Sequence, residues 1–244
     1  MKRILFLVTG CLLWSLSPCH AGFLDDLSRK ILPPAQEQGS LDNSTIINGL
    51  KEALATGTER AVTEVAKQDG YFGNQLIKIL LPDKVKKAAD LLGSLGYQQQ
   101  VDDVVLTMNR AAEKAAPKAA DFFGDAIRQM TVEDAKGILS GGDTAATEFF
   151  AKKTRPLLFD AFKPTVTESM EQVGAVRAYK EMLGKYDVTP LAAFAGIPSM
   201  DMDSYVTNKA LDGLFTIVAE EEKKIRTNPA ARTTDLLRKV FGGK

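Results

Sequence analysis

The chain has 244 residues, of which 45% are hydrophobic and 25% are charged, a composition typical of globular proteins. This length suits one large helical domain or two small ones, with enough apolar residues to build a core. Because Lys plus Arg and Asp plus Glu both number 31, the charge balance gives no support to nucleic-acid binding.

Residues 1–21 have the features of a secretory signal peptide. Lys2 and Arg3 supply a positive start, and the apolar run at positions 4–16 is short for a membrane span. Small residues stand at the expected positions before a cleavage site that ends at Ala21. We therefore expect a periplasmic protein, secreted through a signal peptide cleaved after Ala21, with no transmembrane segment once cleavage has occurred.

Two alternatives remain for this leader. It would stay attached as an uncleaved anchor, or the protein would become a lipoprotein through Cys19. Pro18 lies directly before that cysteine and fits a lipoprotein signal poorly. Both alternatives are therefore disfavoured against cleavage after Ala21.

Cleavage changes the chemistry open to the chain. It removes the one histidine, both cysteines and the one tryptophan, which are His20, Cys11, Cys19 and Trp14. Removing Lys2 and Arg3 from the 31 basic residues leaves 29 against 31 acidic ones, a net charge of −2. Ser-His-Asp and Cys-His catalysis are then impossible within the mature chain, and zinc, haem, copper and iron–sulfur sites lose their usual ligands. We expect neither a cofactor nor a metal.

The mature chain divides into a short N-terminal part and one helical domain. Residues 22–42 hold a short helix and a proline-rich linker, and residues 43–244 form the all-helical domain. The first helix of this domain is predicted over 43–68. Small residues at every fourth position would let another helix approach it closely. These residues are Gly49, Ala53, Gly57 and Ala61.

A turn and an ambiguous apolar run follow this helix. The sequence DGYFGN at 69–74 predicts a turn. The run LIKILL at 76–81 is compatible with a strand or with a helix. Pro82 is placed to start a helix over 83–95, which Gly96 ends.

The longest helical region is predicted over 98–130. Alanine makes its middle thin, and Pro117 is expected to kink or divide it there. Thr131 to Asp134 resembles a capping box with aspartate at the last position. It starts a short helix that Gly141-Gly142 ends.

Two further helices are expected before the C-terminal part. The first begins near residue 143 and is kinked at Pro156, and the second begins at Pro164 and ends at Gly184. An irregular connection is expected over 186–202.

A long C-terminal helix is predicted from residue 203 onwards. Its apolar stripe has the spacing i, i+3, i+4, i+7 and consists of Leu211, Leu214, Phe215 and Val218. Opposite the stripe, Glu220 with Lys224 and Glu222 with Arg226 have the order and spacing of favourable ion pairs. Glu220, Glu221 and Glu222 are expected on a solvated face.

The C-terminal helix ends at Asn228-Pro229, because the residue before a proline avoids the helical region. Thr233 then offers a cap for a shorter helix with its own apolar side. No convincing strand ladder occurs along the chain. The sequence therefore predicts an all-α fold, a single-domain multi-helix bundle with kinked helices and a C-terminal helical hairpin.

Several polar residues are candidates for a binding site. Three of them lie within the alanine-rich helix: Asn109, Arg110 and Glu113. They would form a polar clamp beside a pocket that the small alanines open, or, alternatively, an ion pair or a bond to a neighbouring helix. Arg155 and Arg226 are candidates for binding a carboxylate or a phosphate headgroup, although Arg226 has Glu222 as a competing partner.

The aromatic residues suggest an apolar ligand. Thin helices combined with Phe122, Phe149 and Phe215 would enclose a cavity for a lipid or another small apolar ligand. The alternative is that these phenylalanines simply fill the core.

Four segments match a known family in their order along the chain. They are GLKEAL from Gly49, MNRAAE from Met108, DAKGILSGGDTAAT from Asp134, and ALDGLF with AEEEKKIRTNPAARTTDLLRKVF from Ala210 onwards. On these segments the chain resembles the bacterial envelope family catalogued as domain of unknown function 4197, over about residues 43–242. The resemblance implies a secreted, helical, single-domain protein, and it implies no reaction and no ligand.

The leading hypothesis is therefore a non-enzymatic periplasmic binding or scaffold protein, which binds a lipid, another small apolar ligand or an envelope protein. The alternative is a carboxylate-dependent enzyme that acts on peptidoglycan, of the glycosidase or transglycosylase class. Glu168-Ser169 resembles the catalytic Glu-Ser of helical lytic transglycosylases, but the glycine-rich motif that should follow is absent. Without that role, Glu168 is a surface carboxylate in the middle of a helix.

Overall fold

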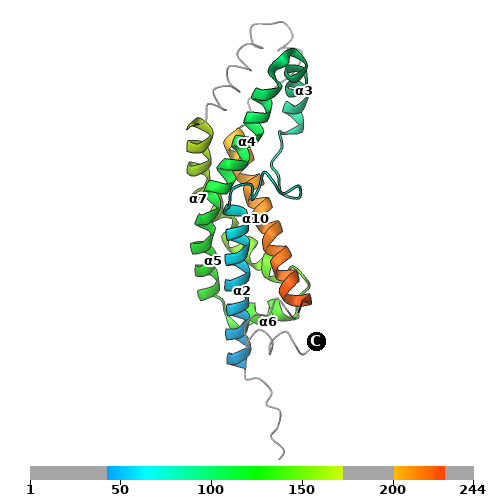
Figure 1. Cartoon of the computed structure of the whole chain (residues 1–244). Coiled ribbons are helices and arrows are strands. Elements are labelled where there is room, and N and C mark those ends of the chain that lie inside the picture. The colour runs from blue at the N-terminus through cyan, green and yellow to red at the C-terminus, as the bar shows by residue number, and fades with distance from the viewer. Residues whose placement is uncertain (1–42, 173–200, 229–244) are drawn as a thin grey trace, which may run out of the picture. The chain divides into compact units, whose positions relative to one another are not determined.

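The computed structural model describes residues 43–172 and 201–228 (Figure 1). The expected signal peptide, the linker at 22–42, the part of the chain that was expected to reach Gly184, and the second helix of the C-terminal hairpin lie outside these residues. Within the described ranges every regular element is a helix, which confirms the all-α fold class.

The elements follow one another in the order α2 (Asn43–Ala66), α3 (Asp83–Leu92), the π-helical turn η1 (Gly93–Tyr97), α4 (Gln98–Ala115), the 3-10 turn η2 (Ala116–Lys118), α5 (Ala119–Arg128), α6 (Val132–Ser140), α7 (Ala145–Gln172) and α10 (Met202–Thr227).

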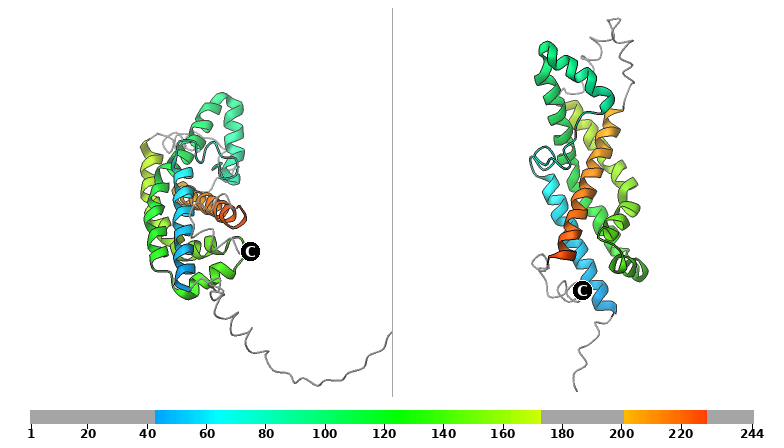
Figure 2. Two further views of the ribbon diagram at one scale, coloured as in Figure 1. Left: turned by 60° about the horizontal axis from the view of Figure 1, so that its bottom comes forward. Right: turned by 90° about the vertical axis from the view of Figure 1, so that its right-hand side faces the viewer.

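Helix α10 packs against α7, α2 and α4, and so joins most of the bundle (Figure 2). Its predicted apolar stripe is buried, with Leu211, Leu214, Phe215 and Val218 all inside the core. The side chain of Asp201 caps its first turn by accepting a hydrogen bond from the backbone N–H of Ser204 at 3.0 Å. The helix ends at Thr227, just before Asn228-Pro229, as the sequence predicts.

The small residues of α2 are buried, and two of them meet α10. The four are Gly49, Ala53, Gly57 and Ala61. Ala53 packs against Ile225, and a Cβ added at Gly57 would lie 3.2 Å from Cδ1 of Ile225. A glycine inside a helix costs about 1 kcal/mol relative to alanine, and the close approach of α10 offsets this cost.

Pro117 divides the long helical region, as predicted. Helix α4 ends at Ala115, η2 contains Pro117, and α5 begins at Ala119. The alanines around this break are fully buried, namely Ala111, Ala112, Ala115, Ala116 and Ala119. Their small side chains allow α7 to pack closely against α4.

Two further helix boundaries lie at or near the positions that the sequence predicts. Thr131 begins α6 with a capping box, in which its Oγ1 accepts from the N–H of Asp134 at 3.1 Å and its own N–H donates to Asp134 Oδ2 at 3.1 Å. Helix α3 ends at Leu92, earlier than expected, and the turn η1 places Gly96 at a φ of 93°, a conformation that favours glycine.

Helix α7 corrects the prediction that a new helix begins at Pro164, because it runs without interruption past both Pro156 and Pro164. A proline inside a helix leaves the carbonyl four residues earlier without its partner. Those carbonyls belong to Lys152 and Asp160, and these residues and both prolines are exposed, so water can satisfy the freed groups. The opposite side of α7 stays packed in the core through Phe150, Leu158, Phe162 and Val166.

Candidate functional site

The polar residues of α4 hold the segment 69–82. Glu113 is buried, and its Oε1 accepts hydrogen bonds from the backbone N–H groups of Tyr71 at 3.1 Å and Phe72 at 3.2 Å. Its Oε2 accepts from Nη1 of Arg110 at 2.6 Å, and Nη2 of Arg110 donates to Asp69 Oδ1 at 2.7 Å. The charged pair therefore fixes the turn that follows α2.

Asn109 binds the next part of this segment as a neighbouring strand would. Its Oδ1 accepts from the backbone N–H of Ile79 at 2.8 Å, and its Nδ2 donates to the carbonyl of Ile79 at 2.8 Å. Residues 78–82 are neither helix nor strand, and a turn covers 75–77. Ile77 and Ile79 point inward while Leu76 and Leu80 are exposed, which is the alternation of an extended chain.

Tyr71 ties the same segment to α10. Its side chain is fully buried, and its hydroxyl donates to the carbonyl of Ala210 at 2.7 Å. A Cβ added at Gly213 would lie 2.6 Å from Cε1 of Tyr71, so only glycine leaves room for the ring. Burial raises the pKa of Tyr71 well above its usual value, so the phenol remains a donor.

A groove of about 1140 Å³ lies beside the fixed segment. Its walls come from residues 78–82, α3, α4 and the start of α10. The apolar side chains that line it are Leu80, Leu81, Pro82, Ala89, Val101 and Val105. Asn109 and Glu113 thus act on this groove from a distance, since they hold the segment that forms one of its walls.

Tyr205 connects the two sides of the groove. It lies in the first turns of α10, and its hydroxyl donates to the carbonyl of Leu80 at 2.9 Å. Burial raises the pKa of Tyr205, and the negative charges of Asp83 and Asp212 raise it further. The hydroxyl therefore keeps its proton, and the hydrogen bond is preserved at neutral pH.

Four lysines lie around the groove: Lys78, Lys84, Lys86 and Lys209. Lys78 lies over the ring of Phe72, with Nζ 3.9 Å from its centroid, and Lys209 pairs with Asp212 at 3.6 Å. Lys84 and Lys86 form no ion pair with any residue that the structure describes. Two ammonium groups are therefore available to an anionic group in the groove.

The aspartates around the groove have partners or favourable places of their own. Asp201 accepts hydrogen bonds from the hydroxyl and the N–H of Ser204, and these, with Lys163, lower the pKa of its carboxyl to about 2. Asp83 lies in the first turn of α3, where the helix dipole favours a negative charge. Asp90 is the third. The unpaired lysines thus remain the groups most open to an outside anion.

A second buried carboxylate corrects the sequence analysis. Glu222 was expected on a solvated face, but it is buried. Its Oε1 accepts from the N–H of Ala146 at 2.9 Å, and its Oε2 accepts from the N–H and the hydroxyl of Thr147, both at 2.8 Å. These N–H groups belong to the first turn of α7, so Glu222 caps that helix from α10.

Arg226 completes this centre. It pairs with Glu222 at 2.8 Å, which confirms the predicted pair, and its Nη2 also donates to the carbonyl of Ile138 near the end of α6 at 2.9 Å. The guanidinium of this candidate anion-binding residue is therefore engaged inside the protein. The other predicted pair is wrong, since Lys224 pairs with Glu221 at 2.6 Å rather than with Glu220.

The candidate phenylalanines lie in or against the core and do not line the groove. Phe215 packs edge-on to Phe123 with ring centroids 6.0 Å apart, and Phe149 meets Phe150 at 5.5 Å. Phe122 is half-buried against the same cluster. Arg155 lies near Phe215 and pairs with Asp212 at 2.6 Å.

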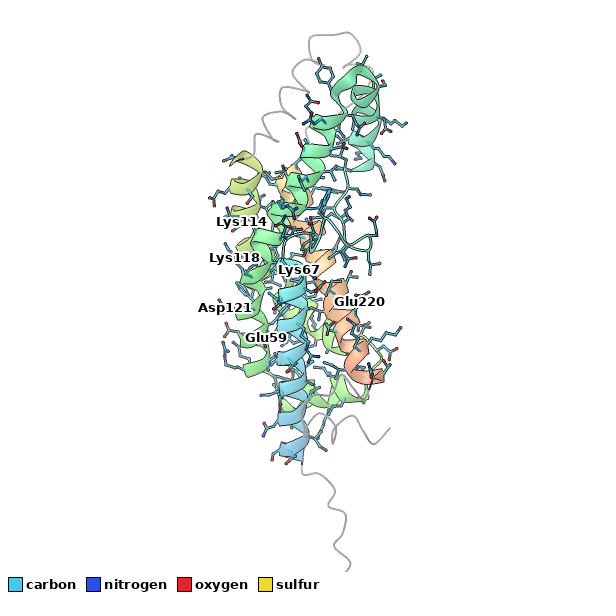
Figure 3. All side chains as sticks on the ribbon, viewed as in Figure 1. Glu59, Lys67, Lys114, Lys118, Asp121 and Glu220 are labelled. Atoms are coloured by element: carbon cyan, nitrogen blue, oxygen red, sulfur yellow. The ribbon has the colours of Figure 1, made fainter. Side chains whose placement is uncertain are left out.

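Glu168 is an exposed carboxylate on α7. Its Oε1 lies 3.8 Å from Nζ of Lys114, which Figure 3 labels on α4 beside Lys118. Glycosidases place two carboxyl groups across a bound sugar. Glu168 lines neither the groove nor the second hollow, which has a volume of about 690 Å³ and lies between α2 and α10.

That second hollow is polar. Its carboxylates include Glu64 and Glu221, which pair with Lys67 and Lys224 at 2.6 Å each. Glu59 and Glu220, labelled in Figure 3, lie on α2 and α10. We interpret it as a solvated surface between two helices.

The groove residues were not among the sequence candidates. None of Val101, Val105, Lys84, Lys86 and Tyr205 was singled out as a site residue. The available signal was the apolar run at 76–81 followed by a lysine-rich helix start. Nothing local in the sequence joins these residues to Tyr205.

The described residues also limit other kinds of site. Within 43–172 and 201–228, no three His, Cys, Asp or Glu side chains gather as metal ligands would. None of the helices in these ranges is both long enough and apolar enough to cross a membrane.

Comparison with known proteins identifies a family. The model of a family described as "Protein of unknown function (DUF4197)" matches residues 40–242. Neither the curated proteins nor the solved structures include a match to the chain.

Proposed function

The chain belongs to the DUF4197 family of proteins of unknown function, and we propose that it is a non-enzymatic periplasmic binding protein that holds a lipid or another small apolar ligand in the groove between α3, α4 and α10. The observation that carries the proposal is the groove itself. Its volume of about 1140 Å³ is slightly above the range of about 300–1,000 Å³ that small-molecule sites occupy, and apolar side chains form much of its lining.

The way the groove is built supports a binding role. Backbone hydrogen bonds hold the two ends of the segment 78–82, at Lys78 and Pro82, and two side-chain contacts position its middle. Asn109 pairs with Ile79, and Tyr205 binds the carbonyl of Leu80. A wall fixed in this way loses little further freedom when a ligand binds, which favours affinity.

The groove does not contain Glu168, the candidate catalytic residue of the alternative peptidoglycan-acting enzyme. Its floor is apolar and its edges carry lysines, whereas Glu168 lies elsewhere on an exposed face. We therefore place the ligand against Leu81, Val101 and Val105, and any polar end of it near Lys84 and Lys86.

Dye binding tests this proposal. Anilinonaphthalene sulfonate, an apolar dye with one negative charge, is expected to bind the purified mature protein with a rise in fluorescence. Val101→Glu puts a carboxylate on the groove floor, so the affinity is expected to fall about tenfold or more. Leu157→Glu is the control, because Leu157 is exposed on α7 and does not line the groove.

Equal dye affinities in the wild type and Val101→Glu would contradict the groove as the binding site. The proposed location has its own test, which is the amino-terminal sequence of protein from the native cell. A chain starting at Gly22 in the periplasmic fraction is expected, and one starting at Met1 in the cytosol would refute secretion.

A further inference from the structure

The turn between α3 and α4 exposes large apolar side chains. Leu91 is 39% exposed at the end of α3, Leu95 is 63% exposed in η1, and Tyr97 is 43% exposed at its end. The turn η1 has no buried residue at all. These three residues, called the apolar tip below, thus contribute little to the core of the protein.

The sequence around the apolar tip is free of charge. Between Asp90 and Asp102 lies a run of 11 residues, LLGSLGYQQQV, with no acidic or basic side chain. Such an uncharged, leucine-containing turn is unfavourable in water, because an exposed leucine forgoes the free energy that burial of its apolar surface would provide. An external apolar environment would recover that free energy.

Lysines stand behind the apolar tip on the same helix. Lys84, Lys87 and Leu91 are spaced by three and four residues, so they share one face of α3. Lys84 and Lys87 are exposed and form no ion pair with any described residue. From Lys84 to Leu91 the helix rises by about 10 Å.

This order of side chains matches the layers of a membrane surface. Apolar side chains of interfacial segments enter about 5–10 Å into the headgroup and acyl boundary, and tyrosine favours the headgroup level. Lys87 and Lys84, about 6 and 10 Å behind Leu91 along the helix, then reach the phosphates.

A protein partner fits the apolar tip less well. A specific protein interface buries about 800 Å² on each partner, and three side chains cannot supply that area on their own. Helix α3 makes its main contacts with η1 and α4 (Figure 1), so no other helix of the described part flanks the tip to enlarge it. A bilayer needs no matching shape.

We infer that the apolar tip is a membrane-contact site, which inserts Leu91, Leu95 and Tyr97 into the surface of an anionic phospholipid bilayer while Lys84 and Lys87 bind its phosphates. The apolar tip and Lys87 lie outside the groove lining, which shares only Lys84 with this site, and the inference holds whether or not the groove carries a ligand.

Vesicle flotation tests the inference with the full mature chain. The protein is expected to float with vesicles of phosphatidylethanolamine and phosphatidylglycerol, and to do so much less with phosphatidylcholine alone. Leu95→Asp is expected to lower the partition coefficient about tenfold or more, because a charge replaces an inserted leucine. Leu157→Asp is the control, because Leu157 on α7 is also more than half exposed, and it should float as the wild type does.

A second variant tests the electrostatic part. Replacing Lys84 and Lys87 by glutamine should weaken binding by about fivefold per lysine at low salt, and less at high salt. The inference is overturned if the wild type does not float with the anionic vesicles, or if Leu95→Asp floats as well as Leu157→Asp. Capture of a protein by the tip without vesicle binding would likewise overturn it.

Discussion

Single polar side chains take the place of backbone partners at three residues of the segment 69–82. Glu113 and Asn109 meet backbone groups of Tyr71, Phe72 and Ile79 that would otherwise be buried without partners. An unmet buried group of this kind costs about 1–3 kcal/mol. The sequence MNRAAE is thus explained by anchoring, and the groove wall depends on it.

The contact between Gly213 and Tyr71 yields a stability prediction. Gly213→Ala is expected to lower the free energy of unfolding by about 1–3 kcal/mol, because a Cβ there would lie 2.6 Å from a ring that is fully buried and hydrogen-bonded. Gly137→Ala is the matched control, since nothing lies within 4 Å of a Cβ at that exposed helical position. The control should gain up to about 1 kcal/mol. Chemical denaturation of both variants measures the change that each makes in the free energy of unfolding. Equal changes would refute the close packing at Gly213.

Tyr71 also predicts a dependence of stability on pH. Because its pKa is raised on folding, the folded state keeps the phenol proton while the unfolded chain loses it above the usual pKa of 10.0. The stabilising effect is therefore complete below pH 10 and decreases as the pH rises. Wild-type stability should fall by about 1.4 kcal/mol per pH unit more steeply than that of Tyr71→Phe in this range. Denaturant titrations from pH 8 to 11 measure the stability of both proteins. If the two stabilities changed with pH in parallel, that result would contradict a buried phenol.

At the scale of elements, Glu222 and Arg226 join three helices. Glu222 caps the first turn of α7, and Arg226 binds both Glu222 and the carbonyl of Ile138 in α6. Local sequence places these residues on α10, yet their partners lie far away along the chain. The centre therefore holds the α6–α7 connection against α10.

The contacts of Glu222 predict that its removal destabilises the protein much more than the removal of Glu220 does. Glu222→Ala should cost about 3–5 kcal/mol, because it removes the carboxylate that pairs with Arg226 and leaves the backbone N–H groups of Ala146 and Thr147 without their acceptor. Glu220→Ala removes an exposed carboxylate two residues away and should change stability by less than about 1 kcal/mol. Similar losses in thermal or chemical unfolding would show that Glu222 is not a buried cap.

The elements could be predicted where local patterns decide them. Apolar periodicity located α2 and α10, and Thr131 and Pro117 marked a start and a break that the structure confirms. The continuity of α7 could not be read locally, because burial of its apolar side overrides the two exposed prolines. The run at 76–81 stayed ambiguous because its partner is a side chain of α4.

The candidate site was harder to predict than the fold. Asn109, Arg110 and Glu113 were candidates for a polar clamp beside a pocket, and the hydrogen bonds favour the alternative of an ion pair and bonds within the protein. Glu222 was misjudged because three glutamates in a row suggest a solvated face, although a helix turns one of them inward. The groove combines residues from several elements, so no single periodic pattern reveals it.

At the scale of the whole molecule, the buried carboxylates and the groove belong to one account. Glu113 and Glu222 fix a loop and a helix start, and the described part also holds a groove lined by apolar side chains and by Lys84 and Lys86, which form no ion pair with a described residue. The apolar tip lies on the same α3–α4 pair. A protein of this kind would take an amphiphile at a membrane surface and hold it without reacting with it.

The most direct test of this account is native mass spectrometry of the protein isolated from its own periplasm. The account predicts the mass of a chain that begins at Gly22 plus a hydrophobic compound, which organic solvent releases and which Val101→Glu lacks. A bare chain in every preparation, with no compound released on denaturation, would contradict ligand binding and favour a scaffold that binds an envelope protein.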